Sequence, residues 1–170
     1  SLYAKSIYQS IIGTSTHKYR AGLSFQYDKY DELLDSTSFK REEVVPGAFL
    51  EYTYTYFKKF SAVVGLRADY HNYYGFFVTP RLHLRYEIQE GSVLRASGGR
   101  GQRTANVIAE NISLLASSRT WNISGNPTIQ GFGLQPEVAW NAGLNFTQNF
   151  RINYKPATLS IDAYHTEFEN

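Results

Sequence analysis

The stretch His17–Asp28, HKYRAGLSFQYD, alternates between apolar and polar side chains without interruption. From Tyr19 to Tyr27 every second residue is aromatic or aliphatic, and the residues between them are charged, polar or glycine. A period of two places successive side chains on opposite faces of a β-strand. The stretch therefore predicts a strand with one apolar face and one face polar enough to carry a whole arginine.

The same alternation recurs along the chain and predicts an all-β fold of about eight antiparallel, up-and-down strands. The strands are expected at residues 2–12, 17–31, 47–57, 61–73, 77–89, 93–102, 137–149 and 157–168. Short joins at 13–16, 58–60, 90–92 and 151–156 alternate with long or irregular joins at 33–46, 72–75 and 102–136. Short turns on one rim and long loops on the other are typical of an outer-membrane barrel.

Bulk composition narrows the class of protein. The 170 residues include 14 tyrosines, 11 phenylalanines and no cysteine. Without cysteine there are no disulfides, thiol nucleophiles or zinc–thiolate sites, and a net charge of +2 is too small to favour nucleic-acid binding. No stretch approaches the roughly 18 apolar residues of a spanning helix, so a membrane role would depend on strands.

Two hairpins allow a prediction of strand register. Three-residue turns at 58–60 and 90–92 would bring same-face residues opposite one another. In this register Glu51 faces Arg67, and Glu87 faces Arg95. The predicted register thus pairs opposite charges on the polar face and apolar residues on the other.

The two faces of the predicted sheet suit two different solvents. In a wide barrel, Leu, Val and Ala would face lipid while charged residues face a wet lumen. The charged residues expected to face the lumen are Glu51, Arg67, Arg81, His83, Arg85, Glu87 and Arg95. A soluble sandwich or lipocalin-like barrel would also alternate, but its strands would be shorter and its interior apolar.

The second half of the chain carries four motifs in order. They are Thr79–Tyr86 (TPRLHLRY), Leu94–Asn106 (LRASGGRGQRTAN), Leu134–Glu137 (LQPE) and Ile161–Asn170 (IDAYHTEFEN). Their order and spacing resemble the later barrel strands of TonB-dependent outer-membrane receptors. The family's Phe-Arg-Ala-Pro stretch is present only in part, as Gln102–Ala105.

The resemblance implies active uptake of a scarce solute across the bacterial outer membrane. The known solute classes of the family are siderophore-iron, haem, cobalamin and oligosaccharide. The implied partners are the plug domain of the same receptor, the TonB complex acting through that plug, and outer-membrane lipid; nucleic acid is not a partner. No cofactor or catalytic residue is expected, since no nucleophile elbow or paired-carboxylate spacing occurs.

The resemblance also implies where solute would bind. The segment 102–136 would be an extracellular loop, and Arg100, Arg103, Arg119 and Trp121 are the candidate substrate-binding residues. The four histidines lie far apart in sequence, and no metal site is expected.

Family members have about 22 strands around a plug. We therefore expect residues 1–170 to be a fragment, namely a sector of a large transmembrane β-barrel that does not include the plug domain. The alternatives are a complete eight-stranded outer-membrane barrel with an anchoring or adhesion role, and a soluble β-barrel that binds a ligand. Pairing between strands 2–12 and 157–168 would favour the small closed barrel.

Overall fold

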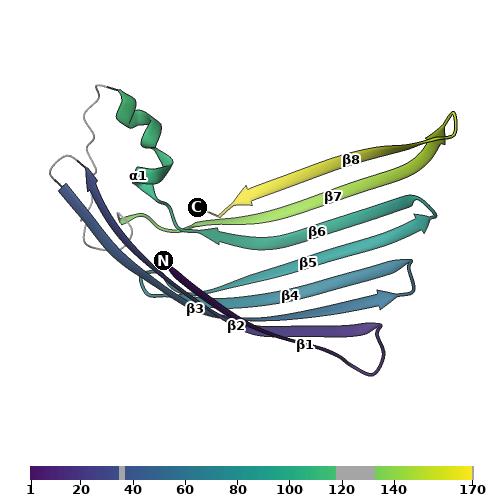
Figure 1. Cartoon of the computed structure of the whole chain (residues 1–170), viewed down its shortest axis with the longest axis horizontal. Coiled ribbons are helices and arrows are strands. Elements are labelled where there is room, and N and C mark those ends of the chain that lie inside the picture. The colour runs from purple at the N-terminus through teal and green to yellow at the C-terminus, as the bar shows by residue number, and fades with distance from the viewer. Residues whose placement is uncertain (35–36, 118–132, 170) are drawn as a thin grey trace.

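A computed structural model describes residues 1–34, 37–117 and 133–169 and shows one antiparallel sheet (Figure 1). Its eight strands follow one another in chain order across the sheet. They are β1 (Leu2–Ile11), β2 (His17–Leu34), β3 (Thr37–Tyr56), β4 (Phe60–His71), β5 (Gly75–Gln89), β6 (Ser92–Arg103), β7 (Glu137–Ile152) and β8 (Lys155–Phe168). A short helix, α1 (Val107–Glu110), and a 3₁₀ turn (Ile112–Ala116) follow β6.

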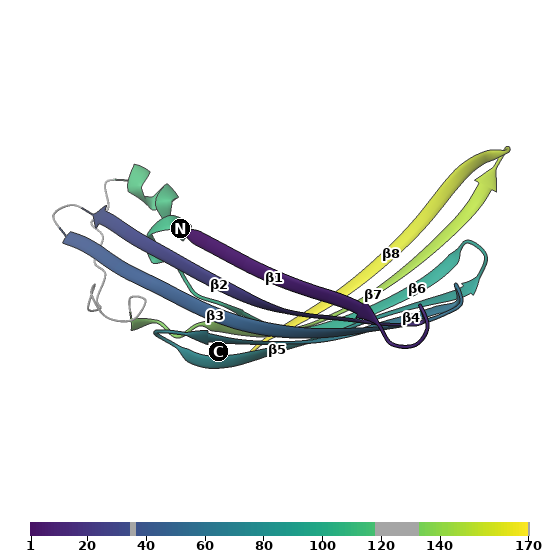
Figure 2. The ribbon, with the colours of Figure 1, turned by 60° about the horizontal axis from the view of Figure 1, so that its bottom comes forward.

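The sheet is open and curved. Within the described residues β1 pairs with β2 and β8 with β7, and no pairing joins β1 to β8. This arrangement contradicts the alternative of a small closed barrel and matches a sector of a wider one. The strands bend together into a trough, with α1 and the β2–β3 hairpin at one end and the short turns at the other (Figure 2). No helix in the described ranges is both long enough and apolar enough to cross a membrane.

The predicted all-β class and the eight strands are confirmed, with one substantial correction to their bounds. Residues 33–46 were expected to form a long join, but β2 runs on to Leu34 and β3 begins at Thr37. The pairing of β2 with β3 continues without a break from His17↔Tyr54 to Leu34↔Thr37. The expected loop is therefore a tall hairpin.

The predicted register of both tested hairpins is wrong by two residues. Tyr56 pairs with Phe60 around a turn of three residues, Phe57–Lys59, so that Glu51 faces Gly65 and Arg67 faces Phe49. A shift of two keeps each side chain on its predicted face, because the side-chain period of a strand is two. The faces were therefore predicted correctly although the opposing residues were not.

The β5–β6 hairpin shows the same shift. Its turn is tighter than expected, with a bulge between Glu87 and Gln89. As a result Glu87 faces Val93, and Arg85 faces Arg95. The predicted opposite-charge pair is replaced by two arginines directly across from each other.

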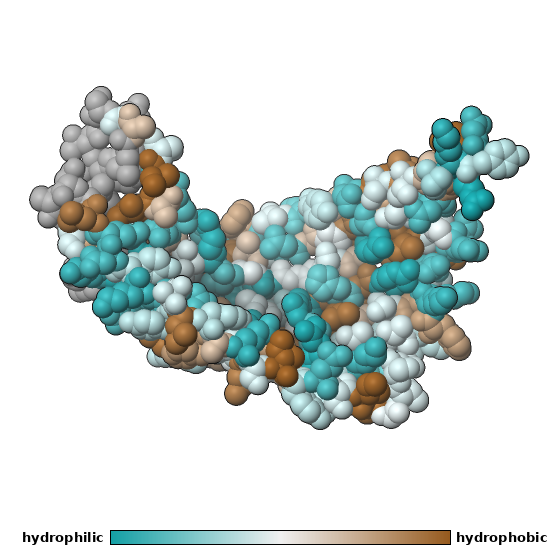
Figure 3. All heavy atoms as spheres, viewed as in Figure 1, coloured by the Kyte–Doolittle hydropathy of each residue, from teal (hydrophilic) through white to brown (hydrophobic). Residues whose placement is uncertain are grey.

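Burial in this sheet is inverted relative to a water-soluble domain. Leu50 is 57% exposed while its neighbour Glu51 is 8% exposed, and the same contrast separates Leu66 (53%) from Asp69 (3%). Hydrophobic residues stand at the surface beside hydrophilic ones (Figure 3). Side chains on the concave face of a curved sheet converge and bury one another, whereas those on the convex face spread apart. The polar face is therefore the concave one.

The apolar convex face ends within the β2–β3 hairpin. Beyond Tyr27 the residues of the same face become charged, and they form two cross-strand ion pairs, Lys29–Glu42 at 3.1 Å and Asp31–Lys40 at 3.5 Å. Charges on this face are costly within lipid. Residues 28–34 and 37–43, which we call the projecting hairpin, thus extend beyond the apolar band.

Candidate functional site

The polar concave face of the sheet is the candidate functional surface, which we call the polar wall. Strand register places all seven charged residues of the sequence prediction on this face. These residues are Glu51, Arg67, Arg81, His83, Arg85, Glu87 and Arg95. Lys18, Arg20, Asp69 and Asp162 share the wall. That the wall lines a lumen stays a prediction.

Glu51 holds two arginines at the centre of the polar wall. Its carboxylate accepts from Arg20 Nη1 at 3.3 Å and from Arg81 Nη2. Gly65 lies between Glu51 and Arg81 in register, and a Cβ there would lie 2.7 Å from Arg81 Nε. The glycine lets the Arg81 side chain lie flat across β4 and reach the carboxylate on β3.

A second buried carboxylate, Asp69, binds Arg67 in a bidentate pair. Arg67 Nε and Nη2 donate to the two carboxylate oxygens at 2.7 and 2.6 Å, and Nη2 also donates to Ser24 Oγ at 2.8 Å. Gly47 faces Asp69, and a Cβ there would lie 1.9 Å from Oδ1. Any side chain at position 47 would therefore displace the Asp69 carboxylate from its present place.

Toward the short turns the polar wall carries unequal charge. Arg85 donates to the Glu87 carboxylate at 2.8 Å, while Arg95 donates to the neutral oxygens Asn145 Oδ1 and Thr147 Oγ1 at 2.9 and 3.2 Å. The predicted contact of Glu87 with Arg95 does not form. Glu87 instead binds the arginine two residues before it on its own strand.

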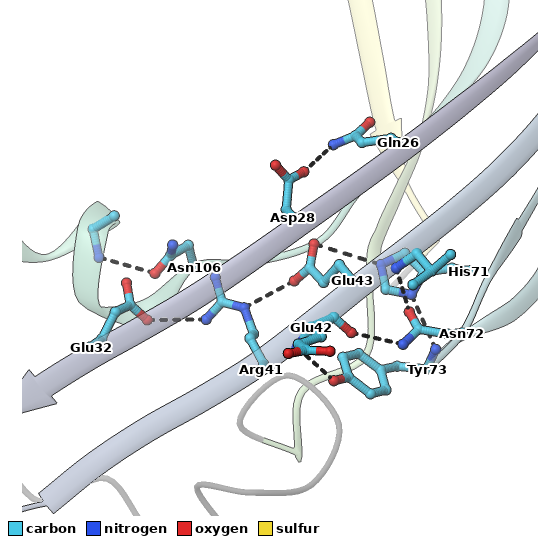
Figure 4. A network of polar contacts seen from close by, with 12 residues as sticks. Gln26, Asp28, Glu32, Arg41, Glu42, Glu43, His71, Asn72, Tyr73 and Asn106 are labelled. Carbon is cyan, nitrogen blue, oxygen red and sulfur yellow. Dashed lines mark hydrogen bonds and ion pairs between the residues drawn. The ribbon is translucent and has the colours of Figure 1, made fainter. Parts of the chain in front are cut away.

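At the opposite end of the sheet a charged cluster joins the projecting hairpin to the β4–β5 turn (Figure 4). We call it the rim cluster, and its residues are Tyr30, Glu32, Arg41, Glu43 and His71. Arg41 donates to Glu32 at 3.2 Å and to Glu43 at 2.9 Å, and its guanidinium lies 3.8 Å from the Tyr30 ring centre. Its side chain is only 10% exposed, so these contacts hold the hairpin's concave face together.

His71 completes the rim cluster from β4. Its Nδ1 accepts from the Tyr73 amide at 3.2 Å, and its Nε2 lies 3.8 Å from Glu43 Oε2. His71 and Arg41 hold the pKa of the Glu43 carboxyl below its ordinary value. The cluster thus favours an ionised Glu43.

The β4–β5 turn extends the sheet with side chains after β4 has ended. Asn72 Oδ1 accepts from the Val44 amide at 3.0 Å, its Nδ2 donates to the Glu42 carbonyl at 2.8 Å, and Tyr73 OH accepts from the Glu42 amide at 3.0 Å. These bonds satisfy backbone groups of β3 that have no further β4 residue opposite them. The turn therefore supports the projecting hairpin.

Sequence reasoning missed the rim cluster and its supporting turn. The available signal was the alternation of Glu32, Arg41 and Glu43 with residues of the other face, but both faces are polar in this segment. With no apolar face, the binary pattern did not distinguish strand from loop.

The predicted substrate-binding residues near the 102–136 segment do not form one site in the described residues. Arg103 binds Glu137 at 2.7 Å and Glu110 at 3.3 Å. Arg100 binds Glu169 at 3.1 Å, and Trp140 Nε1 donates to the same carboxylate. Arg119 and Trp121 lie outside the described residues. Among the residues described, no three histidine or carboxylate side chains gather as metal ligands.

The fold of the chain resembles that of solved receptor structures. No curated protein sequence matches the chain. Among solved structures, a variant of the ferric enterobactin receptor PfeA from Pseudomonas aeruginosa, in complex with enterobactin, matches 99% of the chain with a TM-score of 0.71 and 16% identity. The siderophore receptor PirA from the same organism matches 96% of the chain with a TM-score of 0.69 and 14% identity. These likenesses show the fold.

The chain spans 27% of the PfeA structure and 30% of the PirA structure, so its eight strands correspond to part of a larger barrel. The family described as "TonB dependent receptor-like, beta-barrel" matches residues 3–170. The chain therefore belongs to the TonB-dependent receptor β-barrel family.

Proposed function

We propose that these residues form part of the barrel wall of a TonB-dependent receptor that takes up a scarce solute across the bacterial outer membrane. The observation that carries the proposal is the inverted burial of the sheet: charged residues are buried on the concave face while leucines are exposed on the convex face. An exposed apolar surface of this extent suits lipid rather than water. The family match supports the same assignment.

The orientation of the barrel sector follows from its two ends. We assign the short turns to the periplasm, and the projecting hairpin together with segment 102–136 to the outside. Aromatic rings gather near the short turns on the convex face, among them Tyr54, Phe60 and Tyr56. Aromatic girdles of this kind lie at the membrane–water boundary, so they support a membrane edge at this end.

The proposed partners are those that such a wall requires. Lipid covers the convex face, a plug domain of the same receptor occupies the space before the polar wall, and the TonB complex supplies energy through the plug. The guanidiniums of the polar wall are largely fixed by carboxylates, which suits a wall that supports a plug more than one that binds solute tightly.

The solute class we propose is a ferric siderophore. The two solved structures reported above are receptors for ferric enterobactin and for a siderophore, and this is the basis for carrying the class over to the present chain. The proposed role involves transport without a catalytic step.

Uptake by whole cells tests this function. The receptor containing these residues is expressed in cells that lack their own siderophore receptors, and uptake of ⁵⁵Fe-labelled ferric enterobactin, haem, cobalamin and maltooligosaccharide is compared. We expect energy-dependent accumulation of the ferric siderophore, abolished when TonB is deleted. Accumulation that persists without TonB, or uptake of another solute instead, would overturn the proposal.

A further inference from the structure

Two arginines face each other on the polar wall without a carboxylate between them. Arg85 on β5 and Arg95 on β6 are direct cross-strand partners. Directly opposed residues have Cβ atoms about 4.5–5.5 Å apart, and like charges at that separation destabilise the pair. Such an arrangement is stabilised when an anion binds both guanidiniums.

The partners already present leave cationic charge at this point. Arg85 uses Nη2 for Glu87 and Nη1 for the Lys58 carbonyl. Arg95 reaches Asn145 Oδ1, and Asn145 Nδ2 in turn donates to Asp162 at 2.7 Å. The amide therefore separates Arg95 from the nearest acid on β8. In the described residues Arg95 makes no ion pair with a carboxylate, whereas Arg20, Arg67 and Arg81 each make one.

A groove runs along the concave face beside the two arginines. Its volume is about 270 Å³, and Arg85, Arg95, His83, Ser97, Asn145 and Tyr164 contribute to its lining. Gly143, opposite Ser97, has no side chain to fill the groove, and the Tyr164 ring lies beside it. The groove thus combines cationic groups with apolar and aromatic surface, as a packed polypeptide segment requires.

We propose that Arg85 and Arg95 form a site for a carboxylate side chain of the plug domain, docked in this groove. The inference rests on the proposed function, which supplies a plug in front of the polar wall. A carboxylate between the two guanidiniums would offset their repulsion and could accept a charge-assisted hydrogen bond from each.

The position of the site favours a plug segment over a free solute. Arg95 lies three residues beyond the start of β6 at the short-turn end, whereas the projecting hairpin and α1 lie at the other end (Figure 2). A solute arriving from the loop end would meet the rim cluster and the centre of the wall first. A fixed partner at the short-turn end is therefore the better occupant.

Photo-crosslinking in the full receptor tests the site. Ser97 is replaced by p-benzoylphenylalanine, which places the reactive group in the groove, and Ala96 is replaced in the same way as the control on the convex face. After irradiation of outer membranes, peptides joined to position 97 are identified by mass spectrometry. We expect a plug peptide that contains Asp or Glu at position 97 and no plug peptide at position 96.

Charge reversal then tests the chemistry. Arg95→Glu, with Arg85 unchanged, is expected to lower the crosslink yield at position 97 about tenfold, and reversal of the identified plug carboxylate to lysine is expected to restore it. Arg95→Lys retains the positive charge and should preserve most of the crosslink.

Three outcomes would overturn the site. The first is a crosslink confined to barrel peptides, and the second is a crosslink yield that Arg95→Glu does not change. The third is loss of the plug crosslink when ferric siderophore is added at saturation, because that result would assign the groove to solute. Failure of uptake with an intact, charge-dependent plug crosslink would refute the proposed solute and leave the site standing. A receptor without a plug would refute both.

Discussion

The Glu51 carboxylate provides an energetic test of the polar wall. Glu51→Gln keeps the side-chain shape and removes the charge that Arg20 and Arg81 share. Unit charges 3.3 Å apart, the Arg20–Glu51 separation, attract by about 5 kcal/mol at an effective dielectric constant near 20. The two arginine side chains are 43% and 53% exposed, so water screens much of this attraction.

The expected cost lies between two measured classes of ion pair. Exposed pairs contribute roughly 0.2–1 kcal/mol, and removing one partner of a buried pair costs roughly 3–5 kcal/mol. Glu51 itself is buried and serves two arginines, so we expect Glu51→Gln to lower the free energy of unfolding by about 2 kcal/mol. A change of this size shifts the unfolding equilibrium roughly thirtyfold.

The change in the free energy of unfolding is measured by unfolding the receptor in lipid vesicles with guanidinium chloride. Tryptophan fluorescence follows the transition. Glu87→Gln is the matched control, because Glu87 is less buried and binds one arginine. We expect the control to cost less than about 1 kcal/mol. Equal midpoints for the two variants, or no loss in Glu51→Gln, would refute the view that a shared buried carboxylate organises the wall.

Three further predictions concern the polar wall and its rim. Gly47→Ala should strongly reduce the yield of folded receptor, because the new Cβ would lie 1.9 Å from the Asp69 carboxylate; normal yield in a heat-modifiability gel would contradict the packing. The depressed pKa of Glu43 means that its contribution to stability is present above the ordinary carboxyl pKa of 4.5 and is lost as pH falls below it. Proteolysis of the projecting hairpin should therefore increase at acidic pH, and a Glu43→Gln variant with the same pH profile would refute the assignment. Asn72→Ala should increase hydrogen exchange at the Val44 amide roughly fivefold, since one hydrogen bond that contributes about 1 kcal/mol is lost; unchanged exchange would show that the turn does not support the hairpin.

The sequence was informative where the two faces of a strand meet different surroundings. From His17 to Tyr27 one face is apolar and the other polar, and the predicted strand and both faces agree with the structure. The alternation also held from residue 47 of β3 through β6, which is why the seven charged residues fall on one face. Face assignment depends only on the period of two, and that period is directly visible in the chain.

The register could not be obtained from the same signal. A shift of two residues leaves every side chain on its face, so Glu51 opposite Arg67 and Glu51 opposite Gly65 satisfy the alternation equally well. The choice depends on turn geometry: Phe57 adopts a positive φ of 48° in the β3–β4 turn. A phenylalanine at such a position has no clear signal in the sequence.

The projecting hairpin was missed for a different physical reason. Beyond Tyr27 the convex face is charged as well as the concave one, because Lys29 and Asp31 occupy positions that are apolar nearer the start of β2. The binary pattern disappears although the strand continues. The rim cluster lies in this part of the chain and was therefore not predicted.

The central claim is that the convex face meets lipid and the concave face meets water or a polar plug, and accessibility of single labels tests it most directly. The 170 residues contain no cysteine, so once any cysteines elsewhere in the receptor are replaced, spin labels can be introduced one at a time along β3 at residues 48–53 in the membrane-embedded protein. Oxygen, which concentrates in lipid, should broaden the signals at Ala48, Leu50 and Tyr52, and it should broaden the signals at Phe49, Glu51 and Thr53 less. A uniform profile, or the opposite alternation, would contradict the account.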